Sequence, residues 1–137
     1  MPESQIAGVH ADLVGVWHTP DSFVMDFSAL AEPPQFTALP GAGVMPHHRG
    51  TMHIGPSLDY LDRAYDDAKY GQPSRDPVLE MTMATSVDDT LAPPGKHVAS
   101  LFVQHVAPHL PAPRTWADAR EKEAFADLVI ATITRHA

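Results

Sequence analysis

The chain has 137 residues, of which 44% are hydrophobic and 19% charged, and this composition suits one water-soluble domain with a single core. The net charge of −8 opposes binding to nucleic acid, which is a polyanion, and to anionic membrane surfaces, so we expect no nucleic-acid partner. The chain has no cysteine, no apolar stretch of about 18 residues and no basic leader before an apolar run, which predicts no disulfide, no membrane span and a cytoplasmic location.

The N-terminal segment has the pattern of a β-hairpin. Residues 13–17 and 23–27 are rich in β-forming side chains, and Pro20 and Asp21 between them suit a tight turn. Loops marked by proline and glycine follow as far as Gly43. We therefore expect two parts, a hairpin over residues 1–31 and an α+β segment over residues 32–137.

A short strand and a helix are predicted next. Residues 51–54 form the strand candidate, Ser57 is a natural helix N-cap and Gly71 is a natural stop. The apolar stripe expected to face the core consists of Leu58, Leu61, Ala64, Tyr65 and Ala68. Carboxylates at Asp59, Asp62, Asp66 and Asp67 are expected on the solvated face, with local ion pairs.

Two longer strands and a final helix complete the expected fold. Residues 78–87 place Leu79, Met81 and Met83 on one face, and residues 97–106 are rich in β-formers. The connection over residues 88–96 is too long for a tight turn and is predicted to project from the sheet. The last helix is expected to begin near Thr115, with Phe125, Leu128, Val129 and Ile133 facing the core. The predicted class is α+β, an antiparallel or mixed sheet with two helices packed on one face.

The chain lacks the glycine-rich turns that bind phosphate groups and the GxSxG turn that carries a nucleophile. Gly41 and Gly43 are followed by Pro46, which opposes entry into a helix, so a flexible turn is expected there. We assign no catalytic residue and no cofactor-binding residue from these patterns.

The densest polar group contains His47, His48, Arg49 and His53. Imidazoles bind transition metals, but adjacent residues on a strand point to opposite faces, so we assign no metal site. A polar loop entering a strand and the wall of a substrate cavity, where histidine and arginine bind polar or anionic groups, are the two other interpretations. These four residues are the substrate-cavity candidates.

Five strings in the chain resemble the phytoene-desaturase-like FAD-dependent oxidoreductases, in particular the branch that carries a pyridine nucleotide-disulfide oxidoreductase domain. They are FTALPG (36–41), HHRGTMHI (47–54), PSLDYLDRAYDDAKYG (56–71), SVDDTLAPPGKH (86–97) and FVQ (102–104). The resemblance implies that these residues belong to the substrate-binding domain of a much longer protein.

In that family FAD is held by a motif near the N-terminus and by a segment near the C-terminus, neither of which has a counterpart here. The resemblance therefore implies no cofactor for this chain alone, although FAD serves the family, and no catalysis by the chain alone. Four interpretations stay open: a non-catalytic fragment, one subunit of a split oxidoreductase with a separate FAD-domain chain, a small module that forms a homodimer, and a gene remnant with no selected function.

The N-terminal residues depart from this resemblance. The string GVWHTPDSFVMDF (15–27) is similar instead to the opening hairpin of a small bacterial domain of unknown function. Either the chain has a junction near Ser28 to Glu32, or residues 23–30 serve as the family's own strand before the FTALPG loop.

Overall fold

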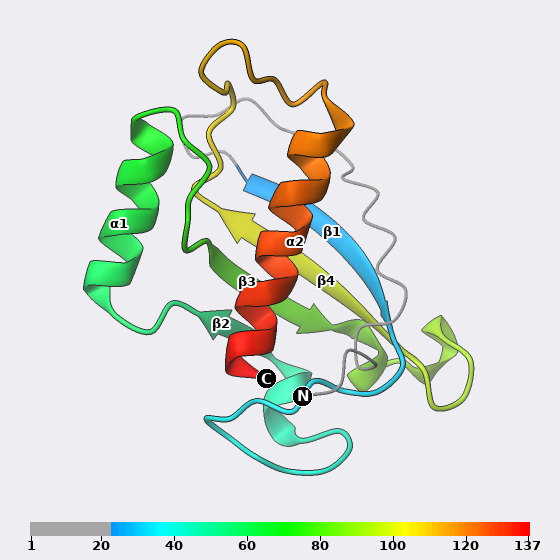
Figure 1. The fold of residues 1–137 in the computed structure, drawn as a ribbon. Helices are drawn as coiled ribbons and strands as arrows, with labels where there is room; N and C mark the ends of the chain where they lie inside the picture. The colour runs from blue at the N-terminus through cyan, green and yellow to red at the C-terminus, as the bar shows by residue number, and fades with distance from the viewer. Residues whose placement is uncertain (1–22) are drawn as a thin grey trace.

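The structure is a computed structural model that describes the backbone of residues 23–137 and the side chains of residues 30–137. Four strands form one sheet in the order β1-β4-β3-β2, and each pair of neighbours is antiparallel. The strands are β1 (Phe23–Leu30), β2 (Thr51–Ile54), β3 (Val78–Met83) and β4 (His97–Gln104). The helices are α1 (Leu58–Lys69) and α2 (Ala119–His136) (Figure 1). The predicted α+β class is confirmed.

The first strand of the expected hairpin, over residues 13–17, lies outside the described residues. Its expected partner lies within β1, which pairs along its whole length with β4, from Phe23 opposite Gln104 to Leu30 opposite His97. Residues on both sides of position 31 thus share one sheet. Whether residues 1–31 have a separate origin stays a prediction.

One face of the sheet is apolar because the strands pair in a register that matches their alternation. Leu79 lies opposite Val103, and Met81 lies opposite Leu101. All four side chains are buried, as expected where one face of an antiparallel sheet packs on a core. The predicted inner face of β3 is therefore confirmed, although β3 ends at Met83, before the short 3-10 helix η2 (Ala84–Ser86).

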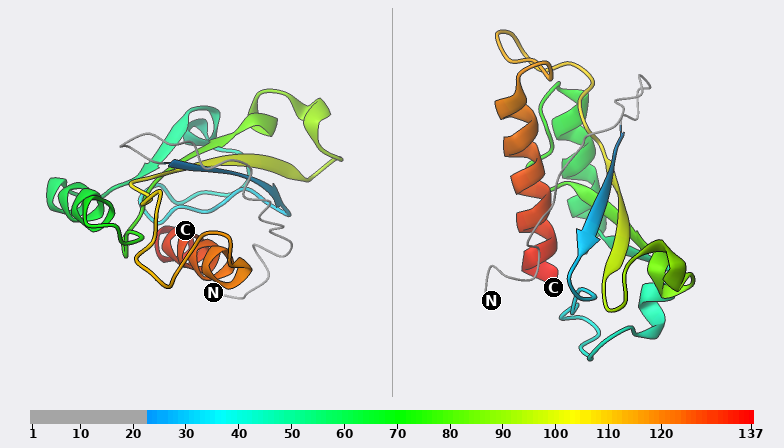
Figure 2. Two further views of the ribbon diagram at one scale, coloured as in Figure 1. Left: turned by 90° about the horizontal axis from the view of Figure 1, so that it is seen from above. Right: turned by 90° about the vertical axis from the view of Figure 1, so that its right-hand side faces the viewer.

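Helix α2 covers this apolar face, as Figure 2 shows from two directions. Its buried side chains Phe125, Val129 and Ile133 belong to the same core cluster as the strand residues. The helix begins later than expected, because Asp118 is the N-cap and accepts a hydrogen bond from the backbone N–H of Arg120 at 3.0 Å. Trp116, just before the helix, packs edge-to-face on Phe125 and donates from Nε1 to the Ala107 carbonyl at 2.8 Å.

Helix α1 lies beside the sheet, at the margin where β3 begins (Figure 1). Its N-cap is Ser57, as predicted, and the Ser57 hydroxyl accepts from the backbone N–H of Tyr60 at 3.1 Å. The predicted apolar stripe is confirmed in part, because Ala64 is buried and Leu61 packs against the same small cluster. It is wrong at Leu58, which is 82% exposed, and it omits Tyr60, which is buried. Tyr60 anchors the helix by donating from its hydroxyl to the Pro77 carbonyl at 2.9 Å, which a stripe counted from leucines does not predict.

The connection between β3 and β4 projects from the sheet, as expected (Figure 1). It contains η2 and a second 3-10 helix, η3 (Asp89–Leu91), whose N-cap Asp88 accepts from the Thr90 backbone N–H at 3.0 Å. Thr85 ties the base of the connection to β4, because its Oγ1 accepts from the backbone N–H of Val98 at 3.1 Å.

The centre of the core should be far more sensitive to truncation than the projecting loop. Leu101→Ala removes a side chain that is 2% exposed and leaves a cavity, so we expect a loss of about 2–5 kcal/mol in the free energy of unfolding. Leu91→Ala, at a position 51% exposed, should change it by no more than about 0.5 kcal/mol. Urea unfolding followed by circular dichroism measures both, and equal effects would contradict the assignment of the core.

Candidate functional site

Three of the four substrate-cavity candidates lie in one short 3-10 helix, η1 (Pro46–Arg49). This polar segment leads directly into β2, as the loop interpretation expected, and the strand alternation that argued against a shared metal ion does not apply to His47 and His48. Their ring centroids are 4.0 Å apart and their planes are tilted by 48°. Arg49 is exposed, whereas His48 is only 1% exposed.

His48 is a structural crosslink between two loop segments. Its Nδ1 accepts a hydrogen bond from the backbone N–H of Met45 at 2.8 Å. Its Nε2 lies 2.9 Å from the Pro34 carbonyl oxygen, which only accepts, so Nε2 carries the ring proton. Both nitrogens are thus used to hold the loop over residues 34–48, and the ring has no nitrogen left for a substrate.

His47 stands in a different state from its neighbour. Phe36 meets its ring edge-to-face with centroids 6.0 Å apart, and both ring nitrogens are shielded from solvent without a hydrogen-bond partner among the described residues. Burial lowers the pKa of His47 below its ordinary value of 6.5, and the neighbouring His48 lowers this pKa further. The neutral ring is therefore the form that the fold accommodates.

His53 lies apart from this pair, on the outer face of β2. The neighbours Met52 and Ile54 are buried, whereas the His53 side chain is 60% exposed. Its Nδ1 lies 3.7 Å from Oε1 of Glu80, which also accepts from the amide of Gln104. The structure thus brings His47 and His48 together and does not bring His53 to them. A shared substrate cavity for the four residues stays a prediction.

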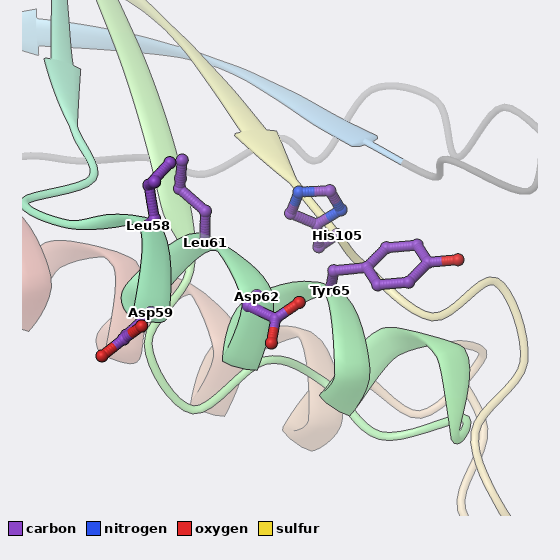
Figure 3. Close-up of a pocket in the computed structure, with 6 residues that line it drawn as sticks. All are labelled: Leu58, Asp59, Leu61, Asp62, Tyr65 and His105. Atoms are coloured by element: carbon purple, nitrogen blue, oxygen red, sulfur yellow. The ribbon is translucent and has the colours of Figure 1, made fainter.

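A groove of about 490 Å³ lies elsewhere, between α1 and the end of β4 (Figure 3). It is lined by Leu58, Asp59, Leu61, Asp62, Tyr65 and His105. Figure 3 shows both leucines pointing toward the side on which His105 lies, and the Asp62 carboxylate between them and Tyr65. Sequence reasoning placed the leucines in the core and the carboxylates on a solvated face, and so missed that they adjoin one hollow.

His105 enters the groove because the backbone turns sharply after β4. Its φ is +60°, the left-handed region that L-residues rarely adopt, and its ring contacts Tyr65 edge-to-face with centroids 5.7 Å apart. The strand end and the helix are thus joined by an aromatic contact at the rim. A histidine next to the end of a strand was the one signal in the sequence for this position.

Neither grouping has the ligand set of a metal centre. Across residues 23–137, no three histidine, aspartate or glutamate side chains are placed together so that they could hold a metal ion. In the same described part of the chain, neither helix is long and apolar enough to cross a membrane.

The described residues form an α+β segment with an open groove beside α1 and two adjacent histidines in η1. In comparisons with known proteins, the chain is similar to proteins named for an oxidoreductase domain. The chain is 40% identical over 108 residues to pyridine nucleotide-disulfide oxidoreductase domain-containing protein 2 of Mus musculus, and 39% identical over 108 residues to the protein of that name in Rattus norvegicus. Each similarity covers 76% of this chain and 18% of the relative, so the chain spans about a fifth of the length of these relatives. No family model and no solved structure matches.

Removing the His48 crosslink should destabilise the fold. His48→Ala leaves the Met45 N–H and the Pro34 carbonyl without their partner and opens a cavity, so we expect a loss of about 2–4 kcal/mol in the free energy of unfolding. His53→Ala, on the exposed face, should cost less than about 1 kcal/mol. Thermal and urea unfolding measure both variants, and a His48→Ala protein as stable as the parent would refute the structural role.

The shielded ring nitrogens of His47 should make stability fall in mild acid. Because the folded pKa is lowered, the unfolded chain takes up a proton first as the pH falls through 6.5, and stability that is complete above this pH is lost progressively toward the lower folded pKa. His47→Phe keeps an aromatic ring against Phe36 and removes the titration. The loss of stability between about pH 7.5 and about pH 5.5 should therefore be smaller in His47→Phe than in the parent. His53→Gln is the control, and an equal reduction in both variants would contradict this assignment.

Proposed function

We propose that this chain forms part of the substrate-binding domain of a flavin-dependent oxidoreductase of the phytoene-desaturase-like kind, and that it does not catalyse alone. The observation that carries the proposal is the identity of 40% over most of this chain to an oxidoreductase-domain protein of which it spans only 18%. A part of that size supplies one portion of a site, and the remaining chemistry comes from other segments.

The distribution of polar groups supports a role in binding above one in catalysis. The long motif strings contain several polar side chains that cap helices or close loops, among them Ser57, Asp88 and His48. Such groups are committed to backbone partners and do not act as acid, base or nucleophile. The sequence also lacks the glycine-rich turn that holds a dinucleotide, so FAD is expected to be bound by other segments.

The turn from β2 to α1 also supports the proposal that FAD is bound by other segments. A dinucleotide pyrophosphate needs glycines at a strand-to-helix turn, so that backbone N–H groups approach it closely. Here the turn contains Gly55, Pro56 and Ser57, and the Ser57 hydroxyl already accepts from one N–H of the first helical turn. A β-carbon added to Gly55 would lie 3.0 Å from the Leu61 side chain, so this glycine serves the packing of α1.

The proposal predicts that the purified chain does not form a tight complex with FAD. Titration of FAD should leave its fluorescence and visible spectrum unchanged at micromolar concentrations. Co-expression with a chain that carries the dinucleotide-binding portion of the mouse relative should give a yellow complex in which the flavin co-purifies. Stoichiometric FAD binding by the chain alone would contradict the proposal, and so would the absence of both a complex and flavin-dependent activity on co-expression.

The same preparation tests the homodimer. Within the described residues, β1 and β2 are the outer strands of the sheet, and outer strands offer unpaired backbone groups to a second copy. Light scattering after size exclusion distinguishes the two possibilities. A monomer that forms a complex with the FAD-domain chain supports the split enzyme. A stable dimer that does not bind the FAD-domain chain supports the interaction module.

A further inference from the structure

We propose that the groove between α1 and His105 binds a basic segment of a protein partner, with Asp59 and Asp62 receiving its guanidinium or ammonium groups and Leu58 and Leu61 its apolar side chains. This inference is independent of the flavin proposal. It follows from the exposure, charge and shape of the groove.

Only part of the apolar wall is surface that the fold does not use, because Leu61 packs against the small core cluster under α1. Leu58 is 82% exposed and Tyr65 is 43% exposed, although both lie on the helix that packs beside the sheet. Burying a leucine removes apolar area from water, which favours association. That gain is still available at Leu58, because Tyr60 and Ala64 anchor α1 in its place.

The charged groups of α1 fall into two kinds. Asp67 is engaged, because Arg75 donates to its carboxylate from Nε and from Nη2, at 3.2 Å and 3.0 Å. Asp59 and Asp62 make no ion pair with any of the described side chains, those of residues 30–137. The groove lining thus carries two carboxylates and no lysine or arginine.

The charge of the groove decides the sign of the ligand. The N-terminus of a helix carries about half a positive elementary charge, which favours anions. Two full negative charges outweigh it in the first two turns of α1. Lys69 shows that the aromatic wall accepts a cation, since its Nζ lies 5.9 Å from the centre of the Tyr65 ring.

The shape of the groove favours a protein segment over a free small molecule. Sites for small molecules enclose most of the ligand surface, whereas this groove is shallow and open along α1. Its volume of about 490 Å³ accommodates a few side chains presented side by side. Leu58 and Asp62 lie four residues apart and are neighbours on the surface of α1, so a partner needs an apolar and a basic side chain in similar proximity.

The experiment is a titration of the full 137-residue chain, without flavin, with a short fluorescein-labelled peptide that contains two leucines and two arginines. Anisotropy measures the affinity, and amide NMR spectra locate the site. We expect binding that weakens as salt rises from about 50 mM to about 300 mM, with shifts centred on the first two turns of α1 and on His105. Peptides with glutamate in place of arginine, or serine in place of leucine, should bind more weakly.

Matched variants separate the groove from general charge. Asp59→Asn with Asp62→Asn should weaken the arginine peptide about threefold to tenfold. The control is Asp66→Asn with Asp127→Asn, which changes the net charge equally at exposed positions outside the groove and should leave the affinity unchanged. Leu58→Ser should also weaken binding, whereas Leu91→Ser, at an exposed position in η3, should not. All substituted side chains are solvent-exposed, and circular dichroism verifies folding.

Five results would overturn the proposal. The first is no binding up to about 1 mM peptide, which corresponds to a negligible affinity. The second is a glutamate peptide that binds as tightly as the arginine peptide. The others are a control pair that weakens binding as much as the groove pair does, and NMR shifts that lie outside α1 and His105. Arginine amide that binds as tightly as the peptide would also overturn it, because the groove would then be a site for a small amine. Each readout is obtained without flavin, so failure here is distinguishable from failure of the oxidoreductase proposal.

Discussion

The antiparallel pairing of β3 with β4 determines where the rest of the molecule can lie. Its register places Leu79 opposite Val103 and Met81 opposite Leu101, and these pairs form the floor on which α2 packs. A slip of one residue would turn these side chains to the outer face and bring Glu80 and Gln104 inward. The buried apolar area under α2 fixes the register, and the register in turn fixes both ends of the two strands.

The strand ends position α1 and the groove. β3 begins immediately after Pro77, whose carbonyl receives the Tyr60 hydroxyl, so the start of this strand determines where α1 is attached. β4 ends at Gln104, and the left-handed backbone of His105 then turns its ring against Tyr65 of the same helix. A non-glycine residue in this conformation costs about 1 kcal/mol or more, which the surrounding contacts must offset. The groove is therefore a consequence of how one helix is held at two strand ends.

Features that depend on strict periodicity or on a local helix cap could be predicted from the sequence. The buried face of α1 could not, because a single tertiary hydrogen bond determines it. Alternation along β3 predicted its buried face, and Ser57 predicted the start of α1. Helical spacing alone ranks Leu58 above Tyr60 as a core residue, yet the Pro77 carbonyl lies within reach of the tyrosine hydroxyl. This hydrogen bond turns the Tyr60 side of α1 toward the sheet, which leaves Leu58 exposed at the groove. The contact between His47 and His48 could not be predicted either. It depends on the 3-10 helix η1, and the sequence pattern indicated only a loop that enters a strand.

Function in this chain is best judged by which polar and apolar groups the fold leaves without an internal task. Within the string PSLDYLDRAYDDAKYG, Ser57 caps the helix, Tyr60 anchors it and Asp67 binds Arg75. In η1, His48 is likewise engaged through two hydrogen bonds to the loop backbone, whereas His47 packs edge-to-face on Phe36 and its ring nitrogens have no partner among the described residues. Leu58, Asp59 and Asp62 have no comparable partner in the described residues. Side chains of this kind can gain contacts from a partner without losing contacts within the fold, which is why the proposed basic segment is assigned to this groove.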